Sequence, residues 1–188
     1  MITIIGYNKN RSNFLVKFLE KNSIPHKFSL IENAICCSEK IILPDTNNIV
    51  TAIKKMSLHN LNNYLQLVQK PILGINNGLR IMCNNILDID RNGLGFFNLD
   101  VKSISDDFKS EDIGELNLNS TDIAINKKNV NFDSSKHLCK TEYAKDSFTL
   151  DNKEYSLVLN NKNYFGLELD IKKNLRIAEN ILKQFVNL

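Results

Sequence analysis

One turn in the sequence has the glycine spacing that is typical of turns carrying a catalytic nucleophile. In Gly74-Ile75-Asn76-Asn77-Gly78, a short apolar run meets a helical pattern at a central residue that has a glycine two positions away on each side. Such a turn between a strand and a helix holds its central residue in a strained, exposed conformation. In enzymes with such a turn, the central residue is a Ser or Cys whose side chain attacks a carbonyl carbon. Backbone N–H groups at the start of the helix then stabilise the oxyanion that forms. We therefore predict an elbow-shaped turn centred on residue 76.

The residue at the centre of this turn is unsuited to covalent catalysis. Asn76 carries a carboxamide whose nitrogen is delocalised into its carbonyl, so it has no acidic proton near neutral pH and forms no ester or thioester. Asparagine is also the residue other than glycine that most readily adopts a positive φ. The chain contains 28 asparagines and only 7 glycines. The turn is therefore predicted to keep its shape without a nucleophile.

The elements that must position this turn alternate between strand and helix in the first half of the chain. Residues 1–6, 40–43 and 71–75 are apolar runs typical of strands. Each is followed by apolar residues at helical spacing: Phe14, Leu15, Phe18 and Leu19; Ile49, Ile53, Met56, Leu61, Leu65 and Val68; Leu79, Met82, Ile86 and Leu87. Three successive units favour a parallel sheet covered by helices on both faces.

The second half of the chain has a different pattern. From Gly93 onward, short alternating segments such as 122–125 and 155–159 indicate antiparallel strands, and 164–169 is the last strand expected. A closing helix has Leu175, Ala178, Leu182 and Phe185 on one face. We find no linker or repeat, so we expect one domain over 1–188. Its predicted fold is a three-layer, flavodoxin-like α/β fold with a mainly parallel sheet and an antiparallel extension in the second half.

Composition excludes several classes of function. The 188 residues are 43% hydrophobic, and the formal charge of +3 comes from scattered basic residues, which argues against a nucleic-acid partner. No apolar window is long enough for a membrane span and no signal peptide is recognisable, so we expect a cytoplasmic protein with no membrane partner. Three dispersed histidines and four cysteines without a Cys-x-x-Cys pair predict reduced, packed thiols, no metal and no cofactor.

Five segments, in this order, resemble the glutaminase subunit of imidazole glycerol phosphate synthase, a class I (triad) glutamine amidotransferase. They are Ile4-Ile5-Gly6-Tyr7, Ile41-Ile42-Leu43-Pro44, Lys70 to Leu79, Gly93-Leu94-Gly95-Phe96 and Phe165 to Asp170. Members of this family hydrolyse glutamine with a Cys-His-Glu triad and pass the ammonia to a (β/α)8-barrel synthase. The resemblance thus implies the amidotransferase fold, a cyclase-type barrel partner in a heterodimer, and a link to histidine biosynthesis.

Compared position by position, the resemblance implies a degenerate triad. The family's cysteine falls on Asn76, its histidine on Asp170 and its glutamate on Lys172. An ordinary aspartate is a poor base for a thiol, and a lysine ammonium orients no imidazole. The family's Pro-Gly-x-Gly segment, which helps to form the oxyanion hole, is here 44–47 and has lost both glycines. The residues of the former pocket and oxyanion region are Asp45, Thr46, Asn47, Asn77 and Gly78.

These positions favour a catalytically inactive subunit that binds a barrel-type synthase and stabilises or regulates it. Two alternatives remain open. One is an enzyme, either an amidotransferase with an unrecognised nucleophile or a related α/β hydrolase that uses Thr46 or Asp170 around the former pocket. The other is a glutamine-sensing module in which Asn76 hydrogen-bonds the amide and Asp170 pairs with the ammonium group. In each case Asn76, Asn77, Asp45 and Asp170 are expected to converge at the carboxyl ends of the parallel strands.

Overall fold

The computed structural model describes residues 1–101, 116–117, 124–125, 138–139, 142–150, 153–169, 171 and 174–188. Its helices are α1 (Lys9–Lys21), α2 (Glu32–Cys36), α3 (Ile49–Leu58), α4 (Leu61–Leu67), α5 (Asn77–Met82) and α6 (Leu175–Val186), with a 3-10 turn η1 (Leu87–Ile89). Its strands are β1 (Ile2–Ile5), β2 (His26–Ser29), β3 (Lys40–Leu43), β4 (Ile72–Ile75), β5 (Cys83–Ile86), β6 (Arg91–Asn92), β7 (Phe97–Val101), β8 (Leu116–Asn117), β9 (Ala124–Ile125), β10 (Leu138–Cys139), β11 (Ala144–Leu150), β12 (Lys153–Asn161) and β13 (Tyr164–Leu167).

The main sheet is parallel in its first part and antiparallel in its second, as predicted. Its order is β10-β12-β13-β4-β3-β1-β2, and β11 also pairs with β12. Within the run β13-β4-β3-β1-β2 of this sheet, each strand pairs in parallel with its neighbour. By contrast, β12 runs antiparallel to β13, β10 and β11. A separate sheet of order β6-β5-β7 follows α5. The strand that leads into the elbow turn, β4, is therefore an interior strand of the parallel part, with β13 on one side and β3 on the other.

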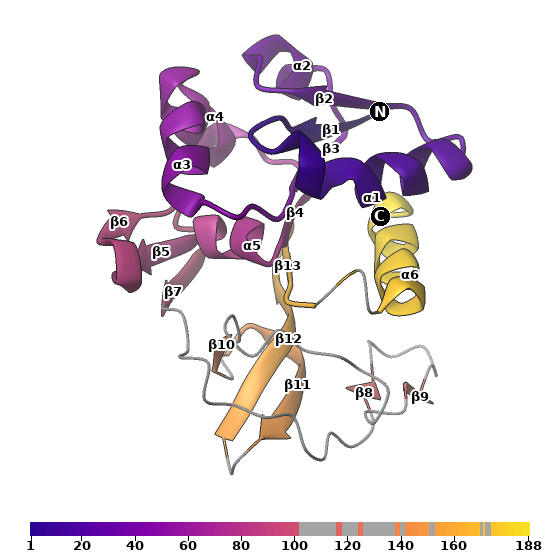
Figure 1. Cartoon of the computed structure of the whole chain (residues 1–188), viewed down its shortest axis with the longest axis vertical. Coiled ribbons are helices and arrows are strands. Elements are labelled where there is room, and N and C mark those ends of the chain that lie inside the picture. Colours follow the sequence, from indigo (N-terminus) through magenta and orange to yellow (C-terminus); the bar gives the residue numbers. More distant parts are fainter. Residues whose placement is uncertain are drawn as a thin grey trace.

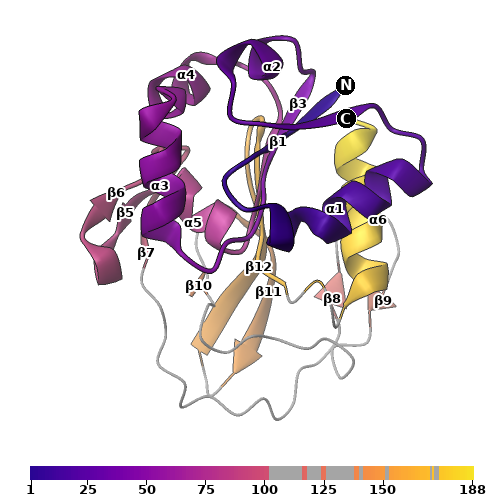
Figure 2. The same ribbon diagram turned by 45° about the horizontal axis from the view of Figure 1, so that its top comes forward.

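Helices cover both faces of the main sheet and complete the three layers. Figures 1 and 2 show α1 and α6 on one side of the strands and α3, α4 and α5 on the other. Leu15 and Phe18 of α1 pack with Ala178 and Leu182 of α6 in one hydrophobic core. A second core on the opposite face holds residues of α3, α4 and α5, among them Met56. The apolar spacing in the sequence thus predicted the buried faces of these helices, apart from Leu175 at the start of α6, which is exposed.

Two asparagine caps fix the loops that follow β1 and β3. The Asn8 side chain accepts a hydrogen bond from the Arg11 backbone N–H at the start of α1, and the Asn48 side chain accepts one from the Thr51 N–H at the start of α3. An N-cap acceptor satisfies a backbone donor that the helix leaves open. Both loops reach the carboxyl edge of the parallel strands in a defined conformation.

The structure corrects the expected helix after the elbow. We predicted helical positions up to Leu87, but α5 ends at Met82 and Cys83 begins β5. The N–H groups of Leu94 and Phe96 donate to the carbonyls of Ile81 and Met82, so the following segment pairs with this one and ends the helix. Sequence analysis also missed β2 and α2. The first is a partly polar edge strand and the second is a short helix of five residues.

The cysteines behave differently from one another. Cys83 is buried, whereas Cys36 and Cys37 are exposed free thiols, so the prediction that the cysteines pack in the core is wrong for these two. The side chain of Cys139 lies outside the part of the chain that the structure describes. No helix among the described residues has the length and apolar character needed to cross a bilayer.

Candidate functional site

The turn between β4 and α5 has the strained geometry predicted for it. Asn76 has φ 50° and ψ −112°, a combination that side-chain-bearing residues rarely adopt. Its N–H donates to the Leu167 carbonyl at 2.8 Å, and its own carbonyl accepts from the Arg80 N–H at 3.1 Å. The first bond ties the turn to β13 and the second starts α5. The positive φ expected at residue 76 is confirmed.

The two glycines of the turn allow α5 to cross the neighbouring strands closely. A Cβ atom on Gly78 would lie 2.1 Å from the carbonyl oxygen of Leu43 at the end of β3. On Gly74 it would lie 2.7 Å from the Cα atom of Leu79. Contacts this short with backbone atoms leave no room for any side chain. The Gly-x-x-x-Gly spacing is therefore a packing requirement of this turn.

Both polar atoms of the Asn76 side chain are bound to the backbone of one residue. Its Nδ2 donates to the Leu169 carbonyl at 3.0 Å, and its Oδ1 accepts from the Leu169 N–H at 2.8 Å. The parallel pairing of β4 with β13 ends at Ile75 and Leu167, so the side-chain amide takes the place of the next peptide unit. The carboxamide thus joins the elbow to the segment that follows β13.

The loop after β3 places a carboxylate against the elbow. Asp45 is buried, and its Oδ1 accepts from the Asn77 backbone N–H at 3.3 Å. Its Oδ2 lies 3.3 Å from the guanidinium of Arg11, which also donates through Nε to the Asn47 side chain at 2.6 Å. In elbow enzymes, the N–H of the residue after the nucleophile helps to stabilise the oxyanion. Here that N–H donates to an anionic side chain of the protein itself.

Further hydrogen bonds hold the same loop. The Asn77 side chain donates to the Thr46 carbonyl at 2.5 Å, and the Tyr7 hydroxyl donates to the Pro44 carbonyl at 2.5 Å. Burial, together with the negative charge of Asp45, raises the pKa of Tyr7 well above its ordinary value. The phenol is therefore a neutral donor over the physiological pH range.

The Thr46 hydroxyl is engaged within its own turn. It donates to the Asn48 carbonyl at 3.3 Å and accepts from the Asn48 N–H at 3.2 Å. The Asn8 side chain also donates to it at 3.4 Å. These are the bonds of a hydroxyl that stabilises a turn.

A buried ion pair joins α5, the helix after the elbow, to the segment that follows β13. The Arg80 guanidinium of α5 is 3.8 Å from the carboxylate of Glu168, and both side chains are almost completely buried. Glu168 directly precedes Leu169, the residue bound by Asn76. Sequence analysis missed Arg80, Glu168 and Arg11. The available signal was a charged residue, Arg80, inside the otherwise apolar start of a helix.

Cys83 lies near this pair and does not replace the missing nucleophile. Burial, with a smaller contribution from the negative charge of Glu168, raises the pKa of the Cys83 thiol to about 12. A thiol with this pKa is protonated at neutral pH, whereas the thiolate is the nucleophilic form. Its Sγ donates to the Leu79 carbonyl at 3.5 Å.

The structure brings most of the sequence-predicted residues together. Asn77 and Gly78 contact the loop that carries Asp45, Thr46 and Asn47, at the carboxyl ends of β3 and β4. Asn76 lies at the same turn and binds Leu167 and Leu169 instead. Asp170 and Lys172 lie outside the described residues. In the part of the chain that is described, no cluster of three or more His, Cys, Asp or Glu residues has the arrangement to hold a metal ion.

Comparisons with known proteins agree with this architecture. No family model matches the chain. Two relatives, from two strains of Bacteroides fragilis, are 20% identical over 194 residues, covering 100% of this chain and 99% of their own length; both are described as imidazole glycerol phosphate synthase subunit HisH. A solved structure described as a glutamine amidotransferase superposes with a TM-score of 0.73 at 10% identity, covering 99% of this chain and 97% of its own. The chain therefore has the fold of a glutamine amidotransferase, and the likeness to HisH supports the class I family.

Proposed function

We propose that this chain is a catalytically inactive subunit with a glutaminase fold, which binds a cyclase-type (β/α)8-barrel synthase and stabilises or regulates it. In this proposal the two chains form a cytoplasmic heterodimer that serves histidine biosynthesis and takes its nitrogen from free ammonia. The single observation that carries the proposal is Asn76. Its carboxamide stands at the centre of the elbow, and both of its polar atoms are bound to the Leu169 backbone. The likeness to subunit HisH supports the choice of partner.

Two separate obstacles oppose glutamine hydrolysis. Covalent hydrolysis needs a thiolate to form a bond to the amide carbon while the nitrogen leaves as ammonia, and the Asn76 carboxamide has no nucleophilic electron pair to offer. The oxyanion formed in that step also needs a free N–H donor. The Asn77 N–H already donates to the Asp45 carboxylate, whose negative charge repels a developing oxyanion. Restoring a cysteine therefore removes only the first obstacle.

A binding role is supported by what the elbow retains. Backbone strain of the kind seen at Asn76 costs about 1–3 kcal/mol and persists only where the surrounding structure enforces it. Gly74 and Gly78 keep the close crossing of α5 over β3 and β4. The shape of the turn around Asn76 is thus maintained at a cost in free energy, although the turn carries no nucleophile. A surface that must fit a partner accounts for that maintenance.

The two alternative functions receive less support from the geometry. A nucleophilic Thr46 needs a general base, but among the described residues its hydroxyl donates to the Asn48 carbonyl. A glutamine sensor that uses the Asn76 amide needs this amide to be available, and its bonds to Leu169 occupy it. Both functions would require these hydrogen bonds to be exchanged for others.

The proposal is tested by co-expressing the chain with a cyclase-type barrel subunit. We expect a complex on size-exclusion chromatography, turnover of the barrel with ammonium salts, and no release of glutamate from glutamine by the chain alone or in the complex. Glutamate release that Asn76→Ala abolishes would contradict catalytic inactivity. Failure of the two purified chains to associate would contradict the docking role.

The two obstacles are separated by restoring the site in steps. The triple variant Asn76→Cys, Asp170→His, Lys172→Glu replaces the triad positions, and adding Asp45→Gly frees the Asn77 N–H. We expect glutaminase activity of the fourfold variant to exceed that of the triple variant by about 100-fold, the typical effect of one oxyanion donor. Asp45→Gly alone is the matched control and should stay inactive. Equal activity with and without Asp45 would show that its carboxylate blocks nothing.

A further inference from the structure

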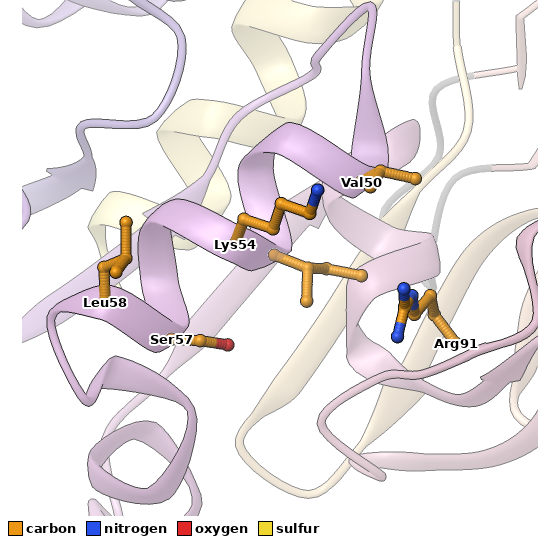
Figure 3. Close-up of a pocket in the computed structure, with 6 residues that line it drawn as sticks. Val50, Lys54, Ser57, Leu58 and Arg91 are labelled. Carbon is orange, nitrogen blue, oxygen red and sulfur yellow. The ribbon is translucent and has the colours of Figure 1, made fainter.

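A groove with a volume of about 450 Å³ lies between α3 and β6. It is lined by Val50, Ile53, Lys54, Ser57 and Leu58 of α3 and by Arg91 of β6. Figure 3 shows Lys54 on the helix and the Arg91 guanidinium turned towards it from the neighbouring strand. None of these residues belongs to the elbow or to the loop that carries Asp45, so the groove is distinct from the site described above.

The groove side of α3 combines half-buried apolar side chains with one exposed leucine. The inner face of this helix places Ile49, Ala52 and Met56 in the core. The groove side adds Val50, Ile53 and Leu58, and Leu58 is 84% exposed. Val50 and Ile53 are half-buried and form the apolar floor of the groove, and Leu58 extends this apolar surface into solvent beside Lys54.

The charges at the groove are all positive and are available to an external partner. Within the described residues, neither Lys54 nor Arg91 takes part in a side-chain hydrogen bond or an ion pair, and no acidic residue lines the groove. The next residue of α3 behaves differently, since Lys55 donates to the Tyr7 carbonyl at 3.0 Å. The groove therefore presents an apolar floor with two cations beside it.

We propose that this groove docks an acidic amphipathic segment of another protein. Apolar side chains of that segment cover Val50, Ile53 and Leu58, and its carboxylates lie opposite Lys54 and Arg91. The occupant is a chain segment and not a small molecule, because Lys54, Ser57, Leu58 and Arg91 are themselves exposed, whereas ligand pockets enclose most of a small molecule. The ten residues of α3 extend over about 15 Å, which matches two to three turns of a docked helix. This inference does not depend on the proposed function of the elbow.

Two designed helical peptides test the proposal with the full-length chain. Both carry the same leucine stripe, and one has Glu where the other has Lys along its flanks. We expect the Glu peptide to bind about tenfold more tightly by fluorescence anisotropy, because two surface charge pairs change sign between the peptides. The variant Lys54→Glu, Arg91→Glu should reverse this preference. Leu58→Gln should weaken binding of both peptides.

The control variant Lys17→Glu, Lys27→Glu makes the same change in net charge at exposed positions on α1 and β2. It should leave the preference for the Glu peptide intact. The proposal is overturned if the two peptides bind equally, if neither binds at millimolar concentration, or if the control variant reverses the preference as well. It is also overturned if decanoate, a small amphipathic anion, saturates the groove at one equivalent while neither peptide competes with it.

Discussion

The turn around Asn76 and the loop that carries Asp45, together called the elbow edge, differ from the α3–β6 groove in how their charged and polar side chains are paired. At the elbow, Asp45 pairs with Arg11 and accepts from the Asn77 N–H, and Asn76 is bound at both ends to Leu169. In the groove, the cationic side chains have no partner within the described chain, and Leu58 projects into solvent. One region is closed on itself, and the other is open to an external molecule.

Because of this difference, we expect the elbow edge to affect the stability of the fold and the groove to affect the binding of a partner. A hydrogen bond formed inside the protein contributes about 0.5–1.5 kcal/mol to folding, and its groups are then no longer available to a ligand without exchange. Catalysis, in contrast, needs donors that remain directed at charge developing in a substrate. Substitutions at the elbow edge should therefore change the free energy of unfolding. Substitutions of the exposed groove residues Lys54, Leu58 and Arg91 should change affinity for a partner and leave stability unaltered.

The largest effect is expected for Gly78→Ala. The added Cβ would lie 2.1 Å from the Leu43 carbonyl oxygen and 2.9 Å from that of Pro44, both of them backbone atoms that cannot rotate away. We expect a loss of about 3 kcal/mol or more in the free energy of unfolding, measured by urea denaturation. Gly6→Ala is the control, because its closest contact of 3.1 Å requires only a small adjustment. A loss below about 1 kcal/mol at residue 78 would mean that α5 can move away from β3.

Substitutions of Asn76 should separate backbone strain from hydrogen bonding. Asn76→Gly loses the two bonds to Leu169 but adopts the positive φ freely, so we expect a loss of about 1 kcal/mol. Asn76→Ala loses the same bonds and keeps the strain, which brings the loss to about 2 kcal/mol. Urea denaturation of the two variants measures the difference directly. Equal losses would show that the elbow relaxes when the amide is removed.

Ionisation of Tyr7 should make the free energy of unfolding depend on pH above the ordinary pKa of a tyrosine. Burial and the charge of Asp45 raise the pKa of this phenol in the folded state, while the unfolded chain ionises near the ordinary value of 10. Below pH 10 the phenol is neutral in both states. Above pH 10 only the unfolded state loses the proton, so stability should fall by about 1.4 kcal/mol per pH unit.

The variant Tyr7→Phe isolates this contribution. It lacks the hydroxyl that donates to the Pro44 carbonyl, so it should be about 1 kcal/mol less stable at neutral pH. The difference in unfolding free energy between the two proteins should then shrink as pH rises above 10 and change sign within about one pH unit. A constant difference across this range would show that the phenol ionises equally easily in the folded protein.

Much of the elbow was predictable because its determinants are local. The glycine spacing around Asn76 and the preference of asparagine for positive φ are visible in five consecutive residues. The stripe at Leu15 and Phe18 likewise predicted a buried helix face, because helical periodicity is a property of neighbouring residues. Local patterns of this kind gave the strand–helix order correctly for β1, β3 and β4.

The features that were missed depend on contacts between distant segments. The family resemblance implies that Asp45 stands at a glycine position, but no sequence pattern indicates that its carboxylate reaches the Asn77 N–H, 32 positions away. Arg80 and Glu168, which also form an ion pair, lie still farther apart in the sequence. The helix after the elbow was predicted too long because its end is set by the Gly93–Phe96 segment that pairs with it. Long-range pairing overrides a local periodic pattern wherever the two disagree.

The smallest effect is expected in the groove, at Leu58→Gln. Leu58 is 84% exposed, so it has little burial to lose, and the free energy of unfolding should change by less than about 0.5 kcal/mol. Met56 on the same helix is fully buried, and Met56→Ala should cost about 2–5 kcal/mol, which shows that the assay detects packing on α3. A loss above about 1 kcal/mol for Leu58→Gln would mean that the chain itself covers this residue. The groove would then be a closed part of the fold, like the elbow edge, and the contrast between the two regions would disappear.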